Sequence, residues 1–226
     1  MNSPSTRDIQ RRVFLSQTDF ADSRLSPLQQ DASFRRYFCI DDGEHGCLLM
    51  DAPPETENLT AWLEIGSHLN HLGLRAPAVL RSDTDAGFAL IEDFGSSTFT
   101  RLLDAGEPHE ALYKQAIDLL IHLHQQPNAL LEGLKPYDFQ ALMTEALLLP
   151  DWFLPLLSGQ PTDPQKRESY QRIWETVFDS LPTPAISLVL RDFHVDNLMA
   201  LPADEPLKQI GLLDFQDALI GPMAYD

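Results

Sequence analysis

Two pairs of short apolar runs in the first 95 residues predict paired β-strands. In the first pair, FRRYFCI (34–40) and GCLLMD (46–51) are separated by the turn-forming stretch DDGEHG. In the second, APAVLRS (76–82) and GFALIED (87–93) flank a turn at residues 83–87. Short apolar runs bounded by Gly, Asp and Pro are typical of strands joined by tight turns. The pattern therefore predicts two β-hairpins.

Apolar residues recur at helical spacing in two further segments, one before the first hairpin and one between the two hairpins. Residues 5–17 place Ile9, Val13 and Phe14 on one helical face, with Ser5 as the amino-terminal cap. Residues 58–73 carry five apolar side chains at broadly helical spacing, and Gly73 provides a stop. These five are Leu59, Leu63, Ile65, Leu69 and Leu72. The first 95 residues are thus expected to run helix, hairpin, helix, hairpin.

The pattern changes after residue 95. Segments with helical periodicity occupy 97–104, 108–126, 138–150 and 163–181. Three short apolar runs near the end, ISLVL, NLMAL and QIGLLD, predict strands. The fold class is therefore α+β, with a β-rich first lobe (1–95), a connector near 93–97 and a mostly helical second lobe (96–226). Clefts between such lobes are common ligand sites.

Charge and composition narrow the class of partner. The chain has 16 Lys and Arg against 34 Asp and Glu, a formal net charge of −18, and no basic cluster longer than a pair. This argues against nucleic acid and anionic membranes as main partners. The amino terminus is too polar for a signal peptide, and no contiguous apolar run reaches the ~18 residues of a membrane span. An acidic, cytoplasmic, globular protein is expected, whose oligomeric state the sequence does not define.

The two cysteines, Cys39 and Cys47, are eight positions apart without a second pair, which makes a zinc site improbable. A disulfide between adjacent strands is one alternative. Two free thiols in a reducing cytoplasm are the favoured one.

Three oxygen-bearing residues near the end form the most informative pattern. Asp192 follows a strand-like run, Asn197 begins the next, and Asp214 ends a third. A hairpin of the last two runs would bring Asn197 and Asp214 to neighbouring ends, with Asp192 close by. Two such ligands suffice for Mg²⁺ bound mainly by water and phosphates, and the third group can serve as a base. Each residue alone is an ordinary turn former, but the three together favour a phosphoryl-transfer site.

The segments LRDFHVDN and LDFQDALIGPMAYD resemble the catalytic and metal-binding loops of the aminoglycoside phosphotransferase and choline kinase family. The segments QQDASFRRYF, LLMDAPPETEN, GFALIEDFG and LLLPDWFLPLL are similar to the bacterial N-acetylmuramate/N-acetylglucosamine kinases within it. The resemblance runs from about Asp31 to Asp226. It implies a protein-kinase-like two-lobed fold whose second lobe is truncated at its carboxyl end. It also implies transfer from ATP, with Mg²⁺, to the anomeric hydroxyl of a small amino sugar.

Carried onto this chain, the resemblance implies Asp192 as catalytic base and Asn197 and Asp214 as Mg²⁺ ligands. It implies nucleotide contacts at three places: the turn covering the phosphates, the third strand, and the connector that receives adenine. These contacts are Ser33, Phe34, Arg35 and Arg36 in the turn, Met50 in the strand, and Glu92, Asp93 and Phe94 in the connector.

The chain departs from the family pattern in two places. Kinases carry a third-strand lysine that meets the phosphates, yet the lysines here are at 114, 135, 166 and 208 only. Met50 or Asp51 occupies that neighbourhood, and Arg35 or Arg36 is the expected substitute. Leu190 stands where the family has histidine in the catalytic loop.

Acceptor-site residues are less clearly indicated. His194 either braces the catalytic loop or touches substrate, and Glu145, Asp151 and Trp152 lie in the segment expected to face the acceptor. Trp152 either stacks on a sugar ring or packs in the core. Two alternative functions stay open: an aminoglycoside-type antibiotic kinase, which the acidic surface would suit, and a non-catalytic nucleotide-binding pseudokinase.

Overall fold

The computed structural model describes residues 5–29, 33–41 and 46–226. Most of the predicted DDGEHG turn, and Asp31 at the start of the family resemblance, lie outside these ranges. The chain divides into two compact units, one of residues 1–123 and 192–217 and one of residues 124–191 and 218–226. In this division α3 (Phe99–Asp104), most of α4 (His109–Gln125) and the segment 192–217 group with the sheet.

A five-stranded antiparallel sheet forms the centre of the first unit, with strand order β1-β2-β3-β5-β4. The strands are β1 (Arg24–Pro27), β2 (Arg36–Asp41), β3 (Cys47–Asp51), β4 (Val79–Asp83) and β5 (Phe88–Glu92). Both predicted hairpins are present, as β2–β3 and β4–β5, whereas β1 was not predicted. Gly87 has a φ of 70°, and a Cβ there would lie 2.1 Å from the carbonyl oxygen of Ala52, so the β4–β5 turn requires glycine.

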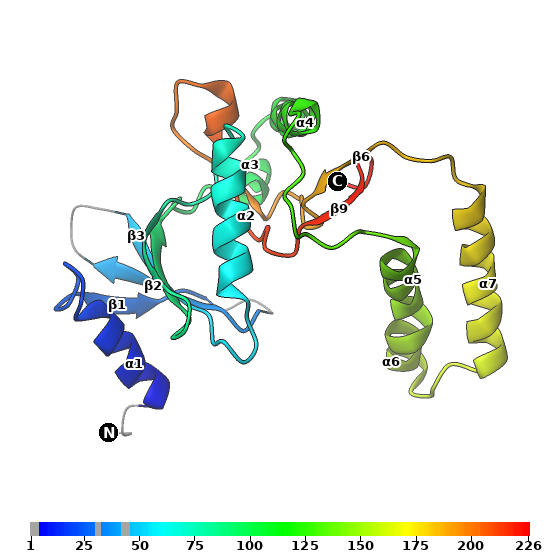
Figure 1. The fold of residues 1–226 in the computed structure, drawn as a ribbon, viewed down its shortest axis with the longest axis horizontal. Helices are drawn as coiled ribbons and strands as arrows, with labels where there is room; N and C mark the ends of the chain where they lie inside the picture. The colour runs from blue at the N-terminus through cyan, green and yellow to red at the C-terminus, as the bar shows by residue number, and fades with distance from the viewer. Residues whose placement is uncertain (1–4, 30–32, 42–45) are drawn as a thin grey trace. The chain divides into compact units, whose positions relative to one another are not determined.

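Helices α1 (Thr6–Leu15) and α2 (Leu59–His71) lie on different sides of this sheet (Figure 1). Successive side chains of β3 point to opposite faces of the sheet. Leu49 belongs to the apolar cluster of Phe14 and Leu15 of α1, whereas Met50 lies beside Trp62 of α2. Both helices begin as predicted, since Ser5 and Asn58 cap them.

The buried face of α1 differs from the prediction. Ile9 and Val13 are exposed, and Arg11, Phe14 and Leu15 are buried. The cause is Asp51, which is 1 % exposed and pairs with Arg7 at 2.6 Å and with Arg11 at 2.9 Å. Arg7 also donates to the carbonyl oxygens of Ala86 and Gly87. A buried carboxylate needs such partners, so charge determines which face of α1 is covered.

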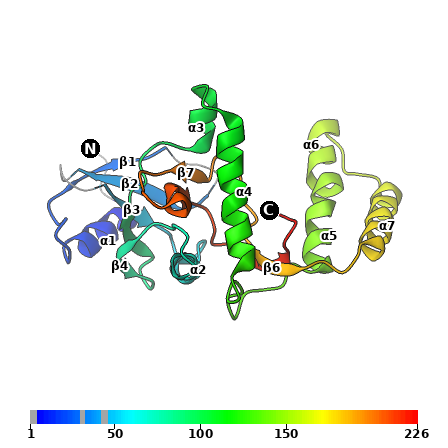
Figure 2. The same cartoon turned by 90° about the horizontal axis from the view of Figure 1, so that it is seen from above.

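The remainder of the first unit contains α3, most of α4, and a further hairpin (Figure 2). This hairpin pairs β7 (Leu198–Ala200) with β8 (Ile210–Leu212), and the 3₁₀ turn η2 (Pro206–Gln209) precedes β8. The amide of Leu212 donates to the carbonyl oxygen of Arg75 at 2.8 Å. That bond joins the hairpin to the segment after α2.

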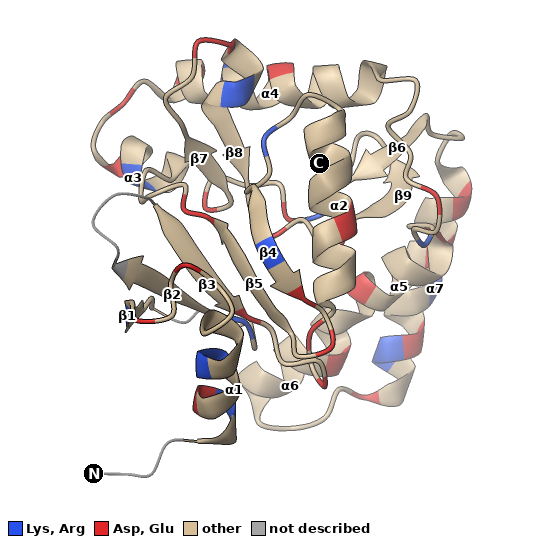
Figure 3. Cartoon of the chain, turned by 60° about the vertical axis from the view of Figure 1, so that its left-hand side comes forward, with Lys and Arg blue, Asp and Glu red and all other residues tan. Residues whose placement is uncertain are grey.

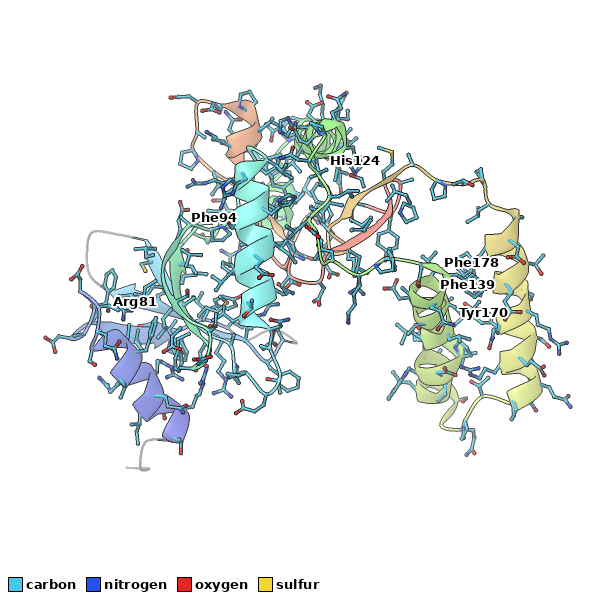
Figure 4. The ribbon with its side chains drawn as sticks, in the orientation of Figure 1. Arg81, Phe94, His124, Phe139, Tyr170 and Phe178 are labelled. Atoms are coloured by element: carbon cyan, nitrogen blue, oxygen red, sulfur yellow. The ribbon has the colours of Figure 1, made fainter. Side chains whose placement is uncertain are left out.

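The second unit is built around helices and one strand pair. Its elements are α5 (Phe139–Leu148), the π-helical turn η1 (Leu149–Phe153), α6 (Leu154–Ser158), α7 (Pro164–Ser180), β6 (Ile186–Val189) and β9 (Leu219–Pro222). Strands β6 and β9 pair antiparallel. Phe139 of α5 and Phe178 of α7 meet between the helices with ring centroids 5.6 Å apart (Figure 4).

The helical run Phe139–Ser158 is long and apolar enough, by length and composition, to cross a membrane, and 11 % of its most apolar stretch is buried. No contiguous apolar run within it reaches 18 residues, as expected from the sequence. Counting contiguous apolar letters missed it because Glu145 and Asp151 interrupt the run. Both carboxylates are paired, Glu145 with Arg191 and Asp151 with Arg167.

Candidate functional site

A cavity of about 280 Å³ lies within the first unit, on the face of the sheet that also contacts α2. Tyr37, Leu48 and Ile91 contribute the sheet side, and Met199 and Leu213 contribute apolar surface from the β7–β8 hairpin. The antiparallel register pairs Leu48 with Ile91, so these two side chains share one face. The result is a slot with apolar side chains on both sides.

The connector after β5 forms one edge of this cavity and is held in place from several directions. The Glu92 carboxylate accepts from Arg75 and from the amide of Ala78, and the Asp93 amide donates to Gly46 at 2.8 Å. Phe94 packs on β8, where a Cβ on Gly211 would lie 2.5 Å from the ring. Among the residues that the structure describes, none accepts the Phe94 amide proton, which therefore can serve a ligand.

The loop between β6 and β7 folds back on the main chain of Asp192. The carbonyl oxygen of Asp192 accepts from the His194 amide at 3.1 Å and from Asn197 Nδ2 at 3.0 Å. Asn197 Nδ2 also lies 3.2 Å from His194 Nε2. The loop therefore fixes the distance between Asp192 and Asn197, and His194 contacts the amide of Asn197.

Asp214 reaches the same cavity from the other strand of the hairpin. Leu198 pairs with Leu212, and the Leu213 amide donates to the Asn197 carbonyl oxygen at 3.0 Å. The predicted hairpin is thus confirmed. Asp214 has a φ of 56°, a left-handed conformation that Asp tolerates better than most residues. Asn197 and Asp214 both line the cavity.

The donor atoms of these two residues fit a divalent cation. Asn197 uses Nδ2 for its bonds inside the loop, which leaves its amide oxygen Oδ1 for a ligand. Asp214 accepts from Arg35 and Gln216 through Oδ1, and no described residue donates to Oδ2. In the described ranges there is no group of three or more His, Cys, Asp or Glu side chains that could hold a metal. Two hard oxygens match Mg²⁺ that is bound mostly by water and phosphate.

Arg35 is the cation of this site. It is 7 % exposed, and its Nη2 donates to Asp214 Oδ1 at 2.5 Å while Nη1 donates to Gln216 Oε1 at 2.5 Å. Burial lowers its pKa, but interactions with Tyr37, Asp214 and Glu57 outweigh burial, so the pKa is raised overall. The guanidinium stays charged at the cavity wall.

The other predicted nucleotide contacts are dispersed. Arg36 lies on the strand face opposite to Tyr37, and its side chain is exposed. Phe34 is 64 % exposed, and Ser33 bonds to Glu57. Met50 is completely buried outside the 280 Å³ cavity, in a crevice bordered by Arg35.

Three predicted acceptor residues belong to the second unit. Glu145 accepts from Arg191 at 2.8 Å and from the hydroxyls of Tyr137 and Tyr225. Asp151 forms two hydrogen bonds with Arg167, and this lowers its pKa. Trp152 is 73 % exposed, so the alternative of core packing is wrong.

Three residues that help to build the site were not among those predicted from the sequence. Tyr37 lines the cavity, Gln216 bridges Arg35 and Asp214, and Glu57 binds the segment 33–35. Strand alternation from Arg35 could have identified Tyr37. Nothing local to the sequence distinguished Glu57 from its acidic neighbour Glu55.

Comparison with known proteins identifies the class. Residues 24–226 match the phosphotransferase enzyme family, and the chain belongs to that family. In the solved structures, an ADP-bound aminoglycoside phosphotransferase APH(2'')-Ib matches 96 % of this chain and 73 % of its own, with a TM-score of 0.63 and 16 % identity. A GDP complex of aminoglycoside 2'-phosphotransferase-IIIa matches 98 % and 76 %, with a TM-score of 0.66 and 15 % identity. The expected α+β, protein-kinase-like fold is confirmed.

The curated relatives are more similar in sequence. The chain is 35 % identical over 205 residues to the N-acetylmuramate/N-acetylglucosamine kinase of Pseudomonas aeruginosa, covering 90 % of this chain and 58 % of that protein. It is 37 % identical to the kinase of the same name from Neisseria meningitidis serogroup B, covering 87 % and 57 %. The resemblance inferred from the sequence motifs is confirmed. The chain spans less than two thirds of the length of these two relatives.

Proposed function

We propose that this protein transfers the γ-phosphoryl group of ATP to a hydroxyl of a small amino sugar, the anomeric hydroxyl of N-acetylmuramate or N-acetylglucosamine. One observation carries the proposal: a single cavity contains an apolar slot, a buried arginine and two oxygen ligands, Asn197 and Asp214. The names of the similar kinases support the acceptor.

Adenine occupies the slot of Tyr37, Leu48, Ile91 and Met199, and the Phe94 amide donates to a ring nitrogen. The phosphates extend from there toward Arg35 and the segment 33–36. A guanidinium offers phosphate oxygens paired N–H donors and can replace the lysine that the first lobe lacks. Glu92 holds the connector in place and does not contact the nucleotide, because its carboxylate already accepts hydrogen bonds from Arg75 and from the Ala78 amide.

Asn197 Oδ1 and Asp214 Oδ2 hold Mg²⁺ in this proposal. The ion, when bound, neutralises charge on the phosphates and orients them for in-line transfer. The protein contributes the fixed positions of both oxygens, since the β7–β8 hairpin and the Asn197–Asp192 bond set them before ligand binds.

Asp192 orients the acceptor hydroxyl and accepts its proton as the oxygen attacks the γ-phosphorus. The new bond is the sugar O–P bond, the broken bond joins the γ-phosphorus to the bridging oxygen, and ADP leaves. His194 braces Asn197, in keeping with the distance of 3.2 Å between their side-chain nitrogens.

The site is proposed to work in the cytoplasm, where ATP is available, on small molecules rather than nucleic acid. The Lys and Arg residues coloured in Figure 3 are distributed over several elements and form no continuous stripe along the ribbon in that view. Cys39 and Cys47 are not joined by a disulfide, which suits a reducing compartment. Cys39 pairs with Leu48, so Cys47 points to the other face of the sheet.

The test is Mg²⁺-dependent ADP formation with N-acetylmuramate, N-acetylglucosamine and kanamycin as acceptors. Turnover on an amino sugar that is lost in Asp192→Asn supports the proposal. Turnover on kanamycin alone would assign the protein to antibiotic modification, and nucleotide binding without turnover on any acceptor would make it a pseudokinase.

A further inference from the structure

Glu57 joins three successive residues of the segment that lies beside the cavity. Its Oε1 accepts from Ser33 Oγ at 3.2 Å and from the Phe34 amide at 3.1 Å, and its Oε2 lies 3.4 Å from Arg35 Nε. The side chain is 15 % exposed. One carboxylate therefore fixes the segment that carries the site's buried arginine, and the mechanism proposed above gives it no role.

Glu57 is itself held in place. Its amide donates to the Pro53 carbonyl oxygen at 2.9 Å, and the next residue, Asn58, caps α2 by accepting from the Ala61 amide at 3.1 Å. A side chain between a closed turn and a helix cap has little freedom, so it can transmit a defined position to its partners.

The guanidinium of Arg35 is held on two sides. Ser33 and Glu57 contact Nε, while Asp214 and Gln216 accept from the two terminal nitrogens. Met50 and Trp62 border the crevice next to it, which is too tight for a water molecule. If Asp214 turned toward another ligand, Ser33 and Glu57 would still hold the guanidinium at the cavity wall.

We propose that Glu57 is a positioning residue that holds the Arg35 guanidinium for the nucleotide phosphates. The inference rests on the proposed function, because it presupposes a nucleotide in the cavity. A long arginine side chain loses conformational freedom when it binds an anion, and a partner that orders it beforehand removes that cost. Glu57 thus acts through Arg35 and does not touch the ligand.

The test is a double-mutant cycle on nucleotide affinity. Calorimetry with ADP and Mg²⁺ is performed on wild type, Glu57→Gln, Arg35→Met and the double variant. Glu57→Gln keeps an acceptor for the Phe34 amide but removes the charge facing Arg35, so binding should weaken about tenfold. With Met at 35, the same change should weaken binding less than about twofold. Glu55→Gln, an equal charge change at an exposed site, is the matched control.

Equal weakening in both backgrounds would make Glu57 a structural residue, and undiminished binding in Glu57→Gln would remove its role entirely. Glu57→Asp keeps the charge with a shorter reach, and an affinity between those of wild type and Glu57→Gln is expected. This variant also tests the role of the charge if Glu57→Gln fails to fold.

Steady-state turnover by Glu57→Gln should show a raised KM for ATP with kcat little changed. If wild type binds no nucleotide, the proposed function itself fails. If wild type binds nucleotide and transfers phosphate, but the cycle shows no coupling between Glu57 and Arg35, only the inference about Glu57 fails.

Discussion

The side-chain nitrogen of Asn197 donates to the main-chain oxygen of Asp192 at 3.0 Å. This bond determines which end of the amide is free, because Nδ2 is used and Oδ1 is left. It also joins the proposed metal ligand to the proposed base through one hydrogen bond. The chemistry of Asn197 therefore depends on being an amide and not merely on supplying an oxygen.

Asn197→Asp should lower kcat/KM by about 10- to 100-fold and raise the Mg²⁺ concentration required for half-maximal rate. A carboxylate supplies the ligand oxygen but turns an acceptor toward the Asp192 carbonyl, so the loop shifts. Magnesium titration of the initial rate measures the effect. An aspartate variant with wild-type magnesium dependence would show that the loop bond is dispensable.

Asp192→Asn should lower kcat by at least about 100-fold while leaving the affinity for ADP within about twofold, because a general base acts on the acceptor and not on the nucleotide. Steady-state rates and calorimetry together measure this. Asp204→Asn, at an exposed position in the same unit, is the control and should retain full turnover. A large loss of ADP affinity in Asp192→Asn would contradict the assignment.

The two neighbouring arginines should differ in their effect on nucleotide binding. Arg35 is buried at the cavity, and Arg36 is exposed on the opposite strand face. Arg35→Met should raise KM for ATP about 10- to 100-fold, because a charge-assisted contact is lost. Arg36→Met should have the smaller effect. The reverse order, in KM measurements at fixed Mg²⁺, would move the phosphate contact to Arg36.

Asp51 should be a stability residue. Asp51→Ala leaves Arg11, itself 8 % exposed, without its buried carboxylate, and should reduce the free energy of unfolding by about 3 to 5 kcal/mol. Urea denaturation monitored by circular dichroism measures it. Asp85→Ala, on an exposed turn, should stay within about 0.5 kcal/mol of wild type. Equal stability of both variants would refute the role of the buried ion pairs.

Tyr137 should make the protein sensitive to alkaline pH. Burial, and then its hydrogen bond to Glu145, raises the pKa of Tyr137 far above the unfolded value of about 10. The folded state therefore keeps a proton that the unfolded state releases, so this stabilisation is complete below pH ~10 and declines above it. Tyr137→Phe should be less stable at pH 8, and its deficit in urea midpoint should shrink by pH 11. Tyr113→Phe, at an exposed site, should show no such convergence.

The fold was largely predictable because its signals are local. The β2–β3 and β4–β5 hairpins, the cap at Ser5 and the stop at Gly73 each follow from short stretches of sequence. Strand β9 could not be found in this way, since it is defined only by pairing with β6 across more than 25 intervening residues. The buried face of α1 was missed because a long-range ion pair outweighed apolar periodicity.

The candidate site likewise contains residues that local sequence signals indicate and residues that only long-range contacts define. The proposal of Asp192, Asn197 and Asp214 came from local signals, because a loop bond joins the first two and the β7–β8 hairpin brings Asn197 and Asp214 to neighbouring ends. Glu57 and Gln216 contact Arg35 across 22 and 181 residues, and no pattern along the chain reports such contacts. The exposure of Trp152 was equally hidden, because it depends on which surfaces η1 meets and not on its apolar neighbours.

Gly211 gives the connector an unusual dependence on a residue without a side chain. The Phe94 ring borders both the 280 Å³ cavity and a second cavity of about 550 Å³, and a Cβ on Gly211 would lie only 2.5 Å from it. Any larger residue at 211 displaces the ring, and space then passes from one cavity to the other. Position 211 thus determines the shape of a cavity wall to which it contributes no side chain, so a substitution there would change the space beside Phe94 while every residue that lines the cavity keeps its identity.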